Sequence, residues 1–198
     1  MRGQAHTLEA TVAGLLMLSS LIFALQMTAV TPLSASTSSQ HIENQQQAAG
    51  EGALSAAASQ GVLKPAILYW NTTIEQYHCK QTPCQRTDPY YTSTAPNGFG
   101  DILTQAFNAN GIAYNVQFRY QTREGGTATD TYIYSGVATD NAVTATRTVI
   151  LRDDDTLYDA EGRPTDTQIG DSMVNHTIKD TGGNIYNTVR IEVIAWRI

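Results

Sequence analysis

The chain has 198 residues, of which 41% are hydrophobic, and a formal net charge of −6. An acidic chain lacks the basic patches that neutralise phosphates, so the composition argues against a nucleic-acid partner. The length allows one domain with a modest core in addition to an N-terminal anchor.

The first element is an almost unbroken apolar run from Thr7 to Val30, which carries no charge after Glu9. About 20 residues at about 1.5 Å each cover the ~30 Å hydrocarbon core of a bilayer, where only a helix satisfies its own backbone. The run predicts a transmembrane helix within residues 1–33. Pro32 disfavours helix at the preceding residue, so we expect the span to end or kink near Thr31.

A secretory signal peptide is the alternative for this run. Its apolar part would be about 7–15 residues long and would end in a small-x-small cleavage site, whereas this run is longer. Arg2 precedes the run and the first basic residue after it is Lys64. This asymmetry favours a cytoplasmic N-terminus and an extracellular C-terminal domain. The sequence thus predicts a single-pass protein of the cell membrane, in contact with membrane lipid.

Glu9 lies at the edge of the span, where a carboxylate costs free energy unless water or a partner solvates it. With Thr7 as the N-cap, Glu9 would fall in the first helical turn, near headgroup water and the positive end of the helix dipole. Water alone is therefore one interpretation of how Glu9 is satisfied.

The sequence Arg2-Gly3-Gln4, followed by Thr7-Leu8-Glu9, resembles the class III signal of type IV pilins. The resemblance implies that a prepilin peptidase cleaves between Gly3 and Gln4. It also implies that Glu9 acts in assembly, by meeting the terminal amine of a neighbouring pilin-like subunit. Glu9 would be the sixth mature residue, whereas bacterial pilins have the glutamate fifth. Archaeal members, including archaellins, vary here and often begin with glutamine.

Residues 34–62 are rich in Ser, Gln and Ala and show no strand alternation. We expect a helical extension of the first helix, with a flexible stalk as the alternative. Its apolar stripe is narrow and consists of Ile42, Ala49, Ala53 and Ala56. Gly50 and Gly52 should each weaken the helix by about 1 kcal/mol.

The two cysteines, Cys79 and Cys84, stand close together. Outside the cell they are expected to form a disulfide, worth about 2 kcal/mol on the chain-entropy model. The alternative is a metal site that also uses His78, but a second ligand pair is missing nearby.

Residues 63–198 are predicted to form an extracellular head. Asn71 and Asn175 lie in glycosylation sequons, Asn71-Thr72-Thr73 and Asn175-His176-Thr177. Periodicity predicts one helix and four strands, and the head is therefore α+β, with an antiparallel sheet and helices on one side. The helix covers 99–108 and ends at a left-handed Asn110-Gly111 cap, and the strands cover 112–122, 131–138, 142–151 and 186–196.

Three features together resemble an uncharacterised family of haloarchaeal pilin-like membrane proteins. They are Thr7-Leu8-Glu9-Ala10, the strand from Ala145 into Asp153-Asp154-Asp155, and the last strand from Tyr186 to Arg197. The few lysines, many threonines and acidic balance also suit a halophilic archaeon. The resemblance implies a surface protein related to pili or their secretion machinery, without catalysis.

Two patterns invite a chemical interpretation. Gly170-Asp171-Ser172 resembles the nucleophile block of some hydrolases, but the only nearby histidine, His176, follows Ser172 by four residues. The acidic stretch 153–161 offers oxygens for calcium, but it has Tyr158 where an EF-hand needs glycine. We expect a turn and a solvated strand end instead. The sequence predicts no catalytic residue, metal or cofactor.

Three classes of function remain open. The first is a pilin-like subunit of an archaeal type IV pilus-like, secretion or adhesion assembly. The second is a membrane-tethered binding module that never polymerises, and the third is a surface enzyme. The sequence favours the first and gives the enzyme the least support.

Overall fold

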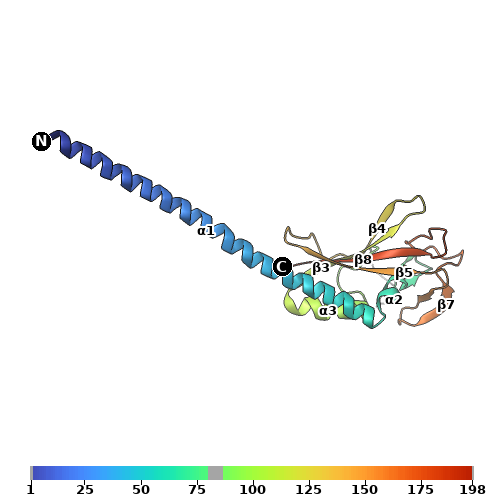
Figure 1. The fold of residues 1–198 in the computed structure, drawn as a ribbon. Coiled ribbons are helices and arrows are strands. Elements are labelled where there is room, and N and C mark those ends of the chain that lie inside the picture. Colours follow the sequence, from blue (N-terminus) through green and yellow to red (C-terminus); the bar gives the residue numbers. More distant parts are fainter. Residues whose placement is uncertain (1, 80–86, 198) are drawn as a thin grey trace. The chain divides into compact units, whose positions relative to one another are not determined.

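The structure is a computed structural model that describes residues 2–79 and 87–197, without the side chains of 2–6 and 27–39. The chain forms two compact units, Met1–Ile42 and Glu43–Ile198. The helix α1, Arg2–Ser59, contributes to both units (Figure 1). Its backbone stays helical through Pro32, so of the two expectations for Thr31, an end or a kink of the helix, the end is wrong. A proline removes one backbone hydrogen bond and crowds the preceding turn, but the turns on either side continue the helix.

The first unit is the apolar part of α1. Thr7–Gln26 is a stretch of 20 residues with a mean hydropathy of 2.0, and none of it is buried in the structure. Its hydroxyl groups bond to the helix itself, because Thr11 donates to the Thr7 carbonyl at 3.1 Å and Ser20 to the Met17 carbonyl at 2.9 Å. The stretch is long and apolar enough to cross a membrane, by length and composition alone.

The second unit begins within α1, well before Leu63, because the last turns of the helix belong to the core. The buried positions follow a helical period and are Gln46, Gly50, Ala53, Leu54 and Ala57. The expected stripe differs from this one, since two of the buried positions are a glutamine and a glycine. A hydrophobicity pattern does not register either residue as core.

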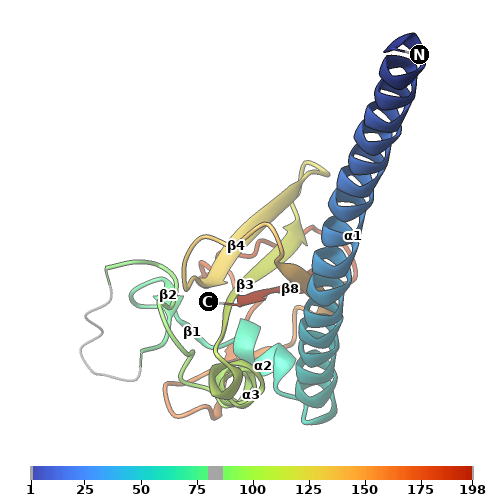
Figure 2. The same ribbon diagram turned by 90° about the vertical axis from the view of Figure 1, so that its left-hand side faces the viewer.

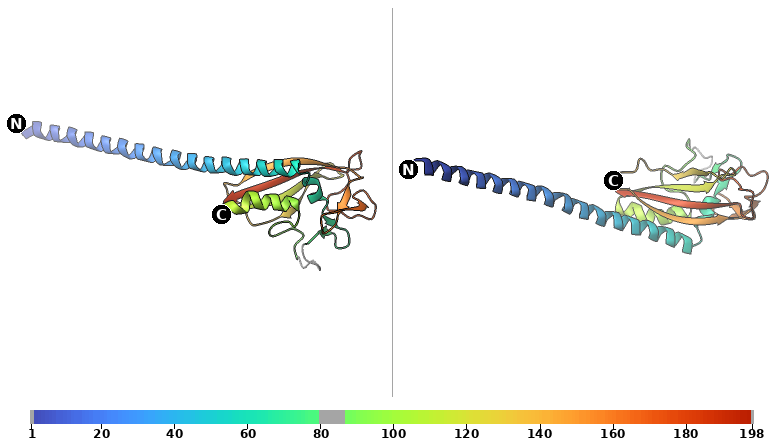
Figure 3. Two further views of the ribbon diagram at one scale, coloured as in Figure 1. Left: turned by 90° about the horizontal axis from the view of Figure 1, so that it is seen from below. Right: turned by 45° about the horizontal axis from the view of Figure 1, so that its top comes forward.

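A four-stranded antiparallel sheet forms the centre of the head, in the order β4-β3-β8-β5. Its strands are β3 (Ile112–Gln121), β4 (Thr127–Ile133), β5 (Val143–Leu151) and β8 (Asn187–Arg197). Val189, Ile191, Val193 and Ala195 are all buried on one face of β8. The expected α+β class with an antiparallel sheet is confirmed, and Figure 3 shows β8 between its neighbours.

The helix α3, Gly98–Phe107, packs on the same core (Figure 2). The Asn97 side chain caps it by accepting the Gly100 N–H at 3.1 Å, and Phe107 is fully buried against Tyr114 of β3. A 3-10 turn, η1 (Asn108–Asn110), continues α3 and ends at Gly111 with a φ of 64°. The predicted helix and its left-handed end are therefore confirmed.

Short elements complete the head. They are α2 (Leu63–Ile67), the two-stranded sheet of β1 (Trp70–Asn71) and β2 (Gln76–Tyr77), and that of β6 (Thr156–Tyr158) and β7 (Pro164–Gln168). The predicted strands did not include β7, and β4 was placed at 131–138. Both strands are polar on their exposed side, so alternation alone did not reveal their limits.

Candidate functional site

The residues predicted for processing and assembly lie in the first unit. Gly3 and Gln4 belong to α1, but their side chains are outside the described part of the structure. Glu9 is exposed on the same helix. Because α1 already begins at Arg2, Thr7 is inside the helix and does not act as its N-cap. The roles of Gly3, Gln4 and Glu9 stay predictions.

Of the two cysteines predicted to form a disulfide, the structure describes Cys79, whereas Cys84 lies outside the described residues. Cys79 is half-buried and follows His78, whose ring lies 5.0 Å from that of Tyr69. Burial lowers the pKa of His78, which favours the neutral ring. The described residues contain no group of three or more His, Cys, Asp or Glu side chains arranged to hold a metal. The disulfide therefore stays a prediction.

The two sequon asparagines have different surroundings. The Asn71 Oδ1 accepts the N–H groups of Thr73 at 2.9 Å and Ile74 at 3.2 Å, which forms a tight turn. The Asn175 Nδ2, to which a glycan would be attached, donates instead to the Glu75 carboxylate at 2.8 Å. Glycosylation stays a prediction at both residues. At Asn71 these hydrogen bonds use the side-chain oxygen, whereas at Asn175 the nitrogen that would carry the glycan is itself a hydrogen-bond donor.

The acidic stretch after β5 stabilises turns. Asp155 accepts from the Lys64 ammonium at 2.9 Å and from the Arg152 N–H at 2.7 Å. Asp159 accepts from the Arg163 N–H at 2.8 Å, and this contact and the guanidinium lower the pKa of its carboxyl. Asp155 is thus bonded both to α2 and to its own turn, and Asp159 is bonded within the turn between β6 and β7.

His176 belongs to the core and is not available to Ser172. Its Nε2 lies 3.1 Å from the Ile67 carbonyl, and its Nδ1 accepts the Ile178 N–H at 3.0 Å. This pair of contacts fits the neutral ring with its proton on Nε2, and burial lowers the pKa of His176 to about 4. Both ring nitrogens are occupied, so His176 is not positioned to act as a base for Ser172.

An aromatic cluster lies beside one partly buried carboxylate, that of Asp130. Asp130 lies on the core face of β4, opposite Phe118 in the register, and accepts the Tyr77 hydroxyl at 2.9 Å. Tyr77 also meets the ring of Trp70 edge-on at 5.1 Å and that of Tyr132 at 4.9 Å. Burial raises the pKa of Asp130 to about 6, although the Tyr77 hydrogen bond opposes the shift. No ion pair to Asp130 is found among the described residues.

Asp130 opens onto a hollow of about 320 Å³, termed the smaller hollow here. Trp70 and Tyr77 also line it, and its polar rim includes Glu75, Asn175 and Lys179. The rim residues form a chain, because Asn175 donates to Glu75 at 2.8 Å and accepts from the Lys179 ammonium at 2.5 Å. The smaller hollow is thus lined by a partly buried carboxylate, aromatic side chains and groups of both charges.

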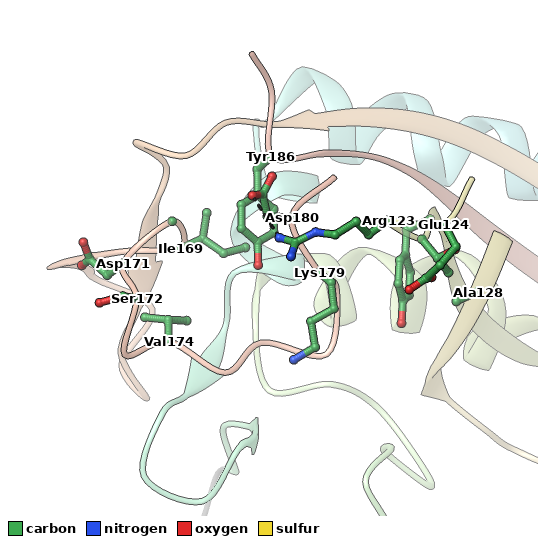
Figure 4. A pocket seen from close by; sticks show the side chains of 13 residues that line it. Arg123, Glu124, Ala128, Ile169, Asp171, Ser172, Val174, Lys179, Asp180 and Tyr186 are labelled. Atoms are coloured by element: carbon green, nitrogen blue, oxygen red, sulfur yellow. Dashed lines mark ion pairs between the residues drawn. The ribbon is translucent and has the colours of Figure 1, made fainter. Parts of the chain in front are cut away.

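A second hollow, of about 520 Å³, shares Lys179 with the first and is termed the larger hollow (Figure 4). Arg123, from the β3–β4 hairpin, extends to Asp180 and pairs with it at 3.7 Å. Ile169 and Val174 give it an apolar side. The pair is long and exposed, so it contributes little to stability.

The sequence did not identify Asp130, Trp70 or Glu75 as candidates. Asp130 could in principle have been identified from the sequence, because a charged residue at a core-facing position of a strand is unusual. The predicted strand began at Thr131, so the face of Asp130 could not be assigned. The interaction of Glu75 with Asn175 joins loops 100 residues apart in sequence, which no local pattern reports.

The family of unknown function DUF7288 matches residues 2–195, nearly the whole chain. The chain belongs to this family. The match includes the apolar helix and the head together, so the combination is a property of DUF7288 and not an addition to an isolated domain. No curated protein and no solved structure matches this DUF7288 chain.

Proposed function

We propose that this chain is a membrane-anchored surface protein that acts as a pilin-like subunit of an archaeal type IV pilus-like or related secretion or adhesion assembly. The observation that carries the proposal is α1. One end of this helix is a fully exposed apolar stretch, Thr7–Gln26, and the turns from Glu43 to Ser59 are part of the core of the head. A single helix therefore supplies both the anchor and a core element.

Physical chemistry supports the first half of this proposal. An apolar stretch of 20 residues left in water would be a large exposed patch, whereas in lipid it is satisfied. The hydroxyls of Thr11 and Ser20 bond to their own helix, as a lipid environment requires. The other half of the proposal, assembly with other subunits, comes from the resemblance of the first residues to a class III signal.

The proposed partners are membrane lipid, other pilin-like subunits and a prepilin peptidase. A tethered binding module that never polymerises is the second candidate, because it shares the anchor, the topology and the fold. The hollows of the head, described above, are the observation that favours this candidate.

The mature N-terminus tests the proposal. Membranes from the native organism are washed with alkaline carbonate, and the retained chain is analysed by intact and N-terminal peptide mass spectrometry. We expect retention in the membrane and a chain that starts at Gln4. An intact Met1 or Arg2 would favour the tethered module. A cut near Ala35 would make the protein secreted and would overturn both candidates.

A further inference from the structure

A third hollow, of about 210 Å³, lies on the four-stranded sheet and is termed the arginine hollow here. Its lining comes from all four strands and consists of Arg119, Tyr120, Gln121, Thr127, Thr148, Thr188 and Arg190. The smaller and the larger hollow are both lined by carboxylates, whereas none of the described residues that line this one is acidic. In a chain with a net charge of −6, the arginine hollow is therefore a positively charged exception.

The register of the sheet holds the two arginines side by side. Arg119 of β3 stands directly opposite Arg190 of β8, and both are exposed on the face that points away from the core. Their neighbours Phe118 and Ile191 are buried on the other face. Opposite side chains in an antiparallel pair have Cβ atoms about 4.5–5.5 Å apart, and like charges in this arrangement destabilise the pair. The sheet thus contains a repulsion that replacing either arginine would remove.

Glu192 compensates for this repulsion only in part. Its carboxylate lies 3.4 Å from the Arg119 Nη1, so it pairs with one of the two arginines. Arg190 forms no ion pair among the described residues. Two guanidinium groups and one carboxylate leave one positive charge uncompensated, and this charge lies at an accessible hollow.

The uncompensated charge selects an anion. A cation would be repelled by both arginines, and a neutral ligand would leave Arg190 without a counter-charge. The guanidinium fork matches the two oxygens of a carboxylate, and such charge-assisted hydrogen bonds are about twice as strong as neutral ones. Glu192, beside Arg119, disfavours a second negative charge on the ligand. A singly charged carboxylate therefore fits the charges better than a doubly charged sulfate or phosphate.

The remaining polar groups of the arginine hollow match hydroxyl groups. The hydroxyls of Thr127, Thr148 and Thr188 form no side-chain hydrogen bond with another described residue. Each of them can donate one hydrogen bond and accept others. Thr148 stands directly opposite Arg190 in the register, so a ligand bound to this arginine also reaches a hydroxyl. Hydroxyl groups on the atoms next to the carboxylate would satisfy these threonines.

We infer that the arginine hollow binds a small hydroxycarboxylate, such as a sugar acid. In this assignment Arg119 and Arg190 bind the carboxylate, and the threonines bind the adjacent hydroxyls. The volume of about 210 Å³ is below the range of about 300–1,000 Å³ for pockets that enclose a drug-sized ligand. The carboxylate end of the ligand therefore enters the hollow, and the rest stays in solvent. The inference does not depend on the proposed membrane assembly.

Saturation-transfer NMR on the full chain tests this assignment. The chain is placed in nanodiscs of zwitterionic lipid, because anionic lipid would compete for the arginines, and the ionic strength is held constant. The probes are methyl glucuronide and methyl glucoside, which share one ring and differ in the carboxylate. The glucuronide is expected to bind with millimolar affinity, and the glucoside at least about tenfold more weakly.

Variants locate the binding. Arg190→Gln removes the uncompensated charge and is expected to weaken glucuronide binding about tenfold. The same change relieves the repulsion, so the head should unfold at the wild-type temperature or above it. A lower unfolding temperature would contradict the repulsion on which the inference rests. Thr148→Val keeps the shape of the side chain, removes one hydroxyl and should weaken binding about threefold.

Arg147→Gln is the matched control. Arg147 is exposed on β5 and stands opposite Ile191, so it lies on the other face of the same sheet. Like Arg190, it forms no ion pair among the described residues. Arg147→Gln removes the same charge from the chain, and it should bind the glucuronide as wild type does.

Three binding results would overturn the inference. The first is that the glucuronide and the glucoside receive saturation equally, or that neither receives any. The second is that Arg190→Gln and Arg147→Gln bind the glucuronide equally well, which would place the ligand elsewhere on the head. The third is that inorganic sulfate, added as a competitor at the same ionic strength, binds more tightly than the glucuronide, which would show a general anion patch.

Discussion

At the scale of single residues, Asp130 gives the head an unusual dependence on pH. Its carboxyl is partly buried with Tyr77 as its hydrogen-bond donor, and desolvation raises its pKa to about 6. Between about pH 4 and 6 the folded state therefore binds more protons than the unfolded state, and stability falls as the pH rises. Above pH 6 the head carries the cost of a partly desolvated carboxylate that has a hydrogen bond but no ion pair among the described residues.

Asp130→Asn is accordingly expected to stabilise the head by about 1–2 kcal/mol at pH 8, because a neutral amide replaces the charge and still accepts from Tyr77. The gain should shrink toward zero by pH 4, where the wild-type carboxyl is protonated. Urea unfolding followed by tryptophan fluorescence measures it, since Trp70 and Trp196 both lie in the head. A gain that is the same at pH 8 and pH 4 would contradict the buried charge.

His176 changes the stability of the head with pH in the opposite direction to Asp130. Its pKa is lowered to about 4, so the unfolded state binds more protons between pH 6.5 and 4 and stability falls as the pH falls. In wild type this loss offsets the gain from protonating Asp130. The Asp130→Asn variant should therefore lose stability toward pH 4 more steeply than wild type. NMR of the His176 ring should show no titration above pH 5.

At the scale of elements, the sequence predicted the strands that alternate strongly and missed those that do not. β8 was recognised because its buried residues, Val189 to Ala195, alternate with polar ones. The end of α3 was recognised from Asn110-Gly111, where the backbone needs a positive φ. The core face of α1 was misassigned because Gln46 and Gly50 are buried. Close packing of backbones, and not hydrophobicity, selects a glycine there.

The two glycines of α1 in the head form a matched pair. An added Cβ at Gly50 would lie 2.9 Å from the Ala145 Cβ, whereas one at Gly52 would meet nothing within 4 Å. Gly52→Ala is expected to stabilise the head by about 0.5–1 kcal/mol, through helix propensity alone. Gly50→Ala should destabilise it by about 1 kcal/mol, because the overlap with a β-strand outweighs the same propensity gain.

The free energy of unfolding of the full chain in urea measures both changes. Ala145→Gly in the Gly50→Ala background removes the overlapping atom and should recover part of the loss, beyond the sum of the single changes. If Gly50→Ala stabilised the head as much as Gly52→Ala, the close approach of α1 to β5 would be disproved.

At the scale of the whole molecule, the sequence predicted an anchor, a head and a helical extension between them, with a flexible stalk as the alternative. The helical extension is confirmed, because α1 continues past Pro32 to Ser59, and it contributes Leu54 and Ala57 to the head core. The sites depend on tertiary contacts such as Asp130 with Tyr77, 53 residues apart. Contacts between residues far apart in sequence determine where a hollow forms and which residues line it. The order of residues along the chain does not reveal such contacts.

The proposed role of Glu9 in assembly can be tested by a single substitution. Glu9→Gln keeps the size and hydrogen-bonding capacity of the side chain while it removes the charge that would attract a neighbour's terminal amine. In a low-dielectric setting such a pair is worth a few kcal/mol, and at a wet interface less than about 1 kcal/mol. Glu9→Gln is therefore expected to reduce co-purification with other pilin-like subunits at least tenfold, if the pair forms within lipid.

The fold of the head should not change in this variant, because Glu9 lies outside the unit that begins at Glu43. Membrane insertion and protease resistance of the head are therefore expected to match wild type. Glu43→Gln makes the same substitution on the same helix beyond the apolar stretch, and it should co-purify as wild type does. Unchanged co-purification of Glu9→Gln would mean that the charge of Glu9 does not act in assembly, and the tethered module would then account better for α1 than a polymerising subunit.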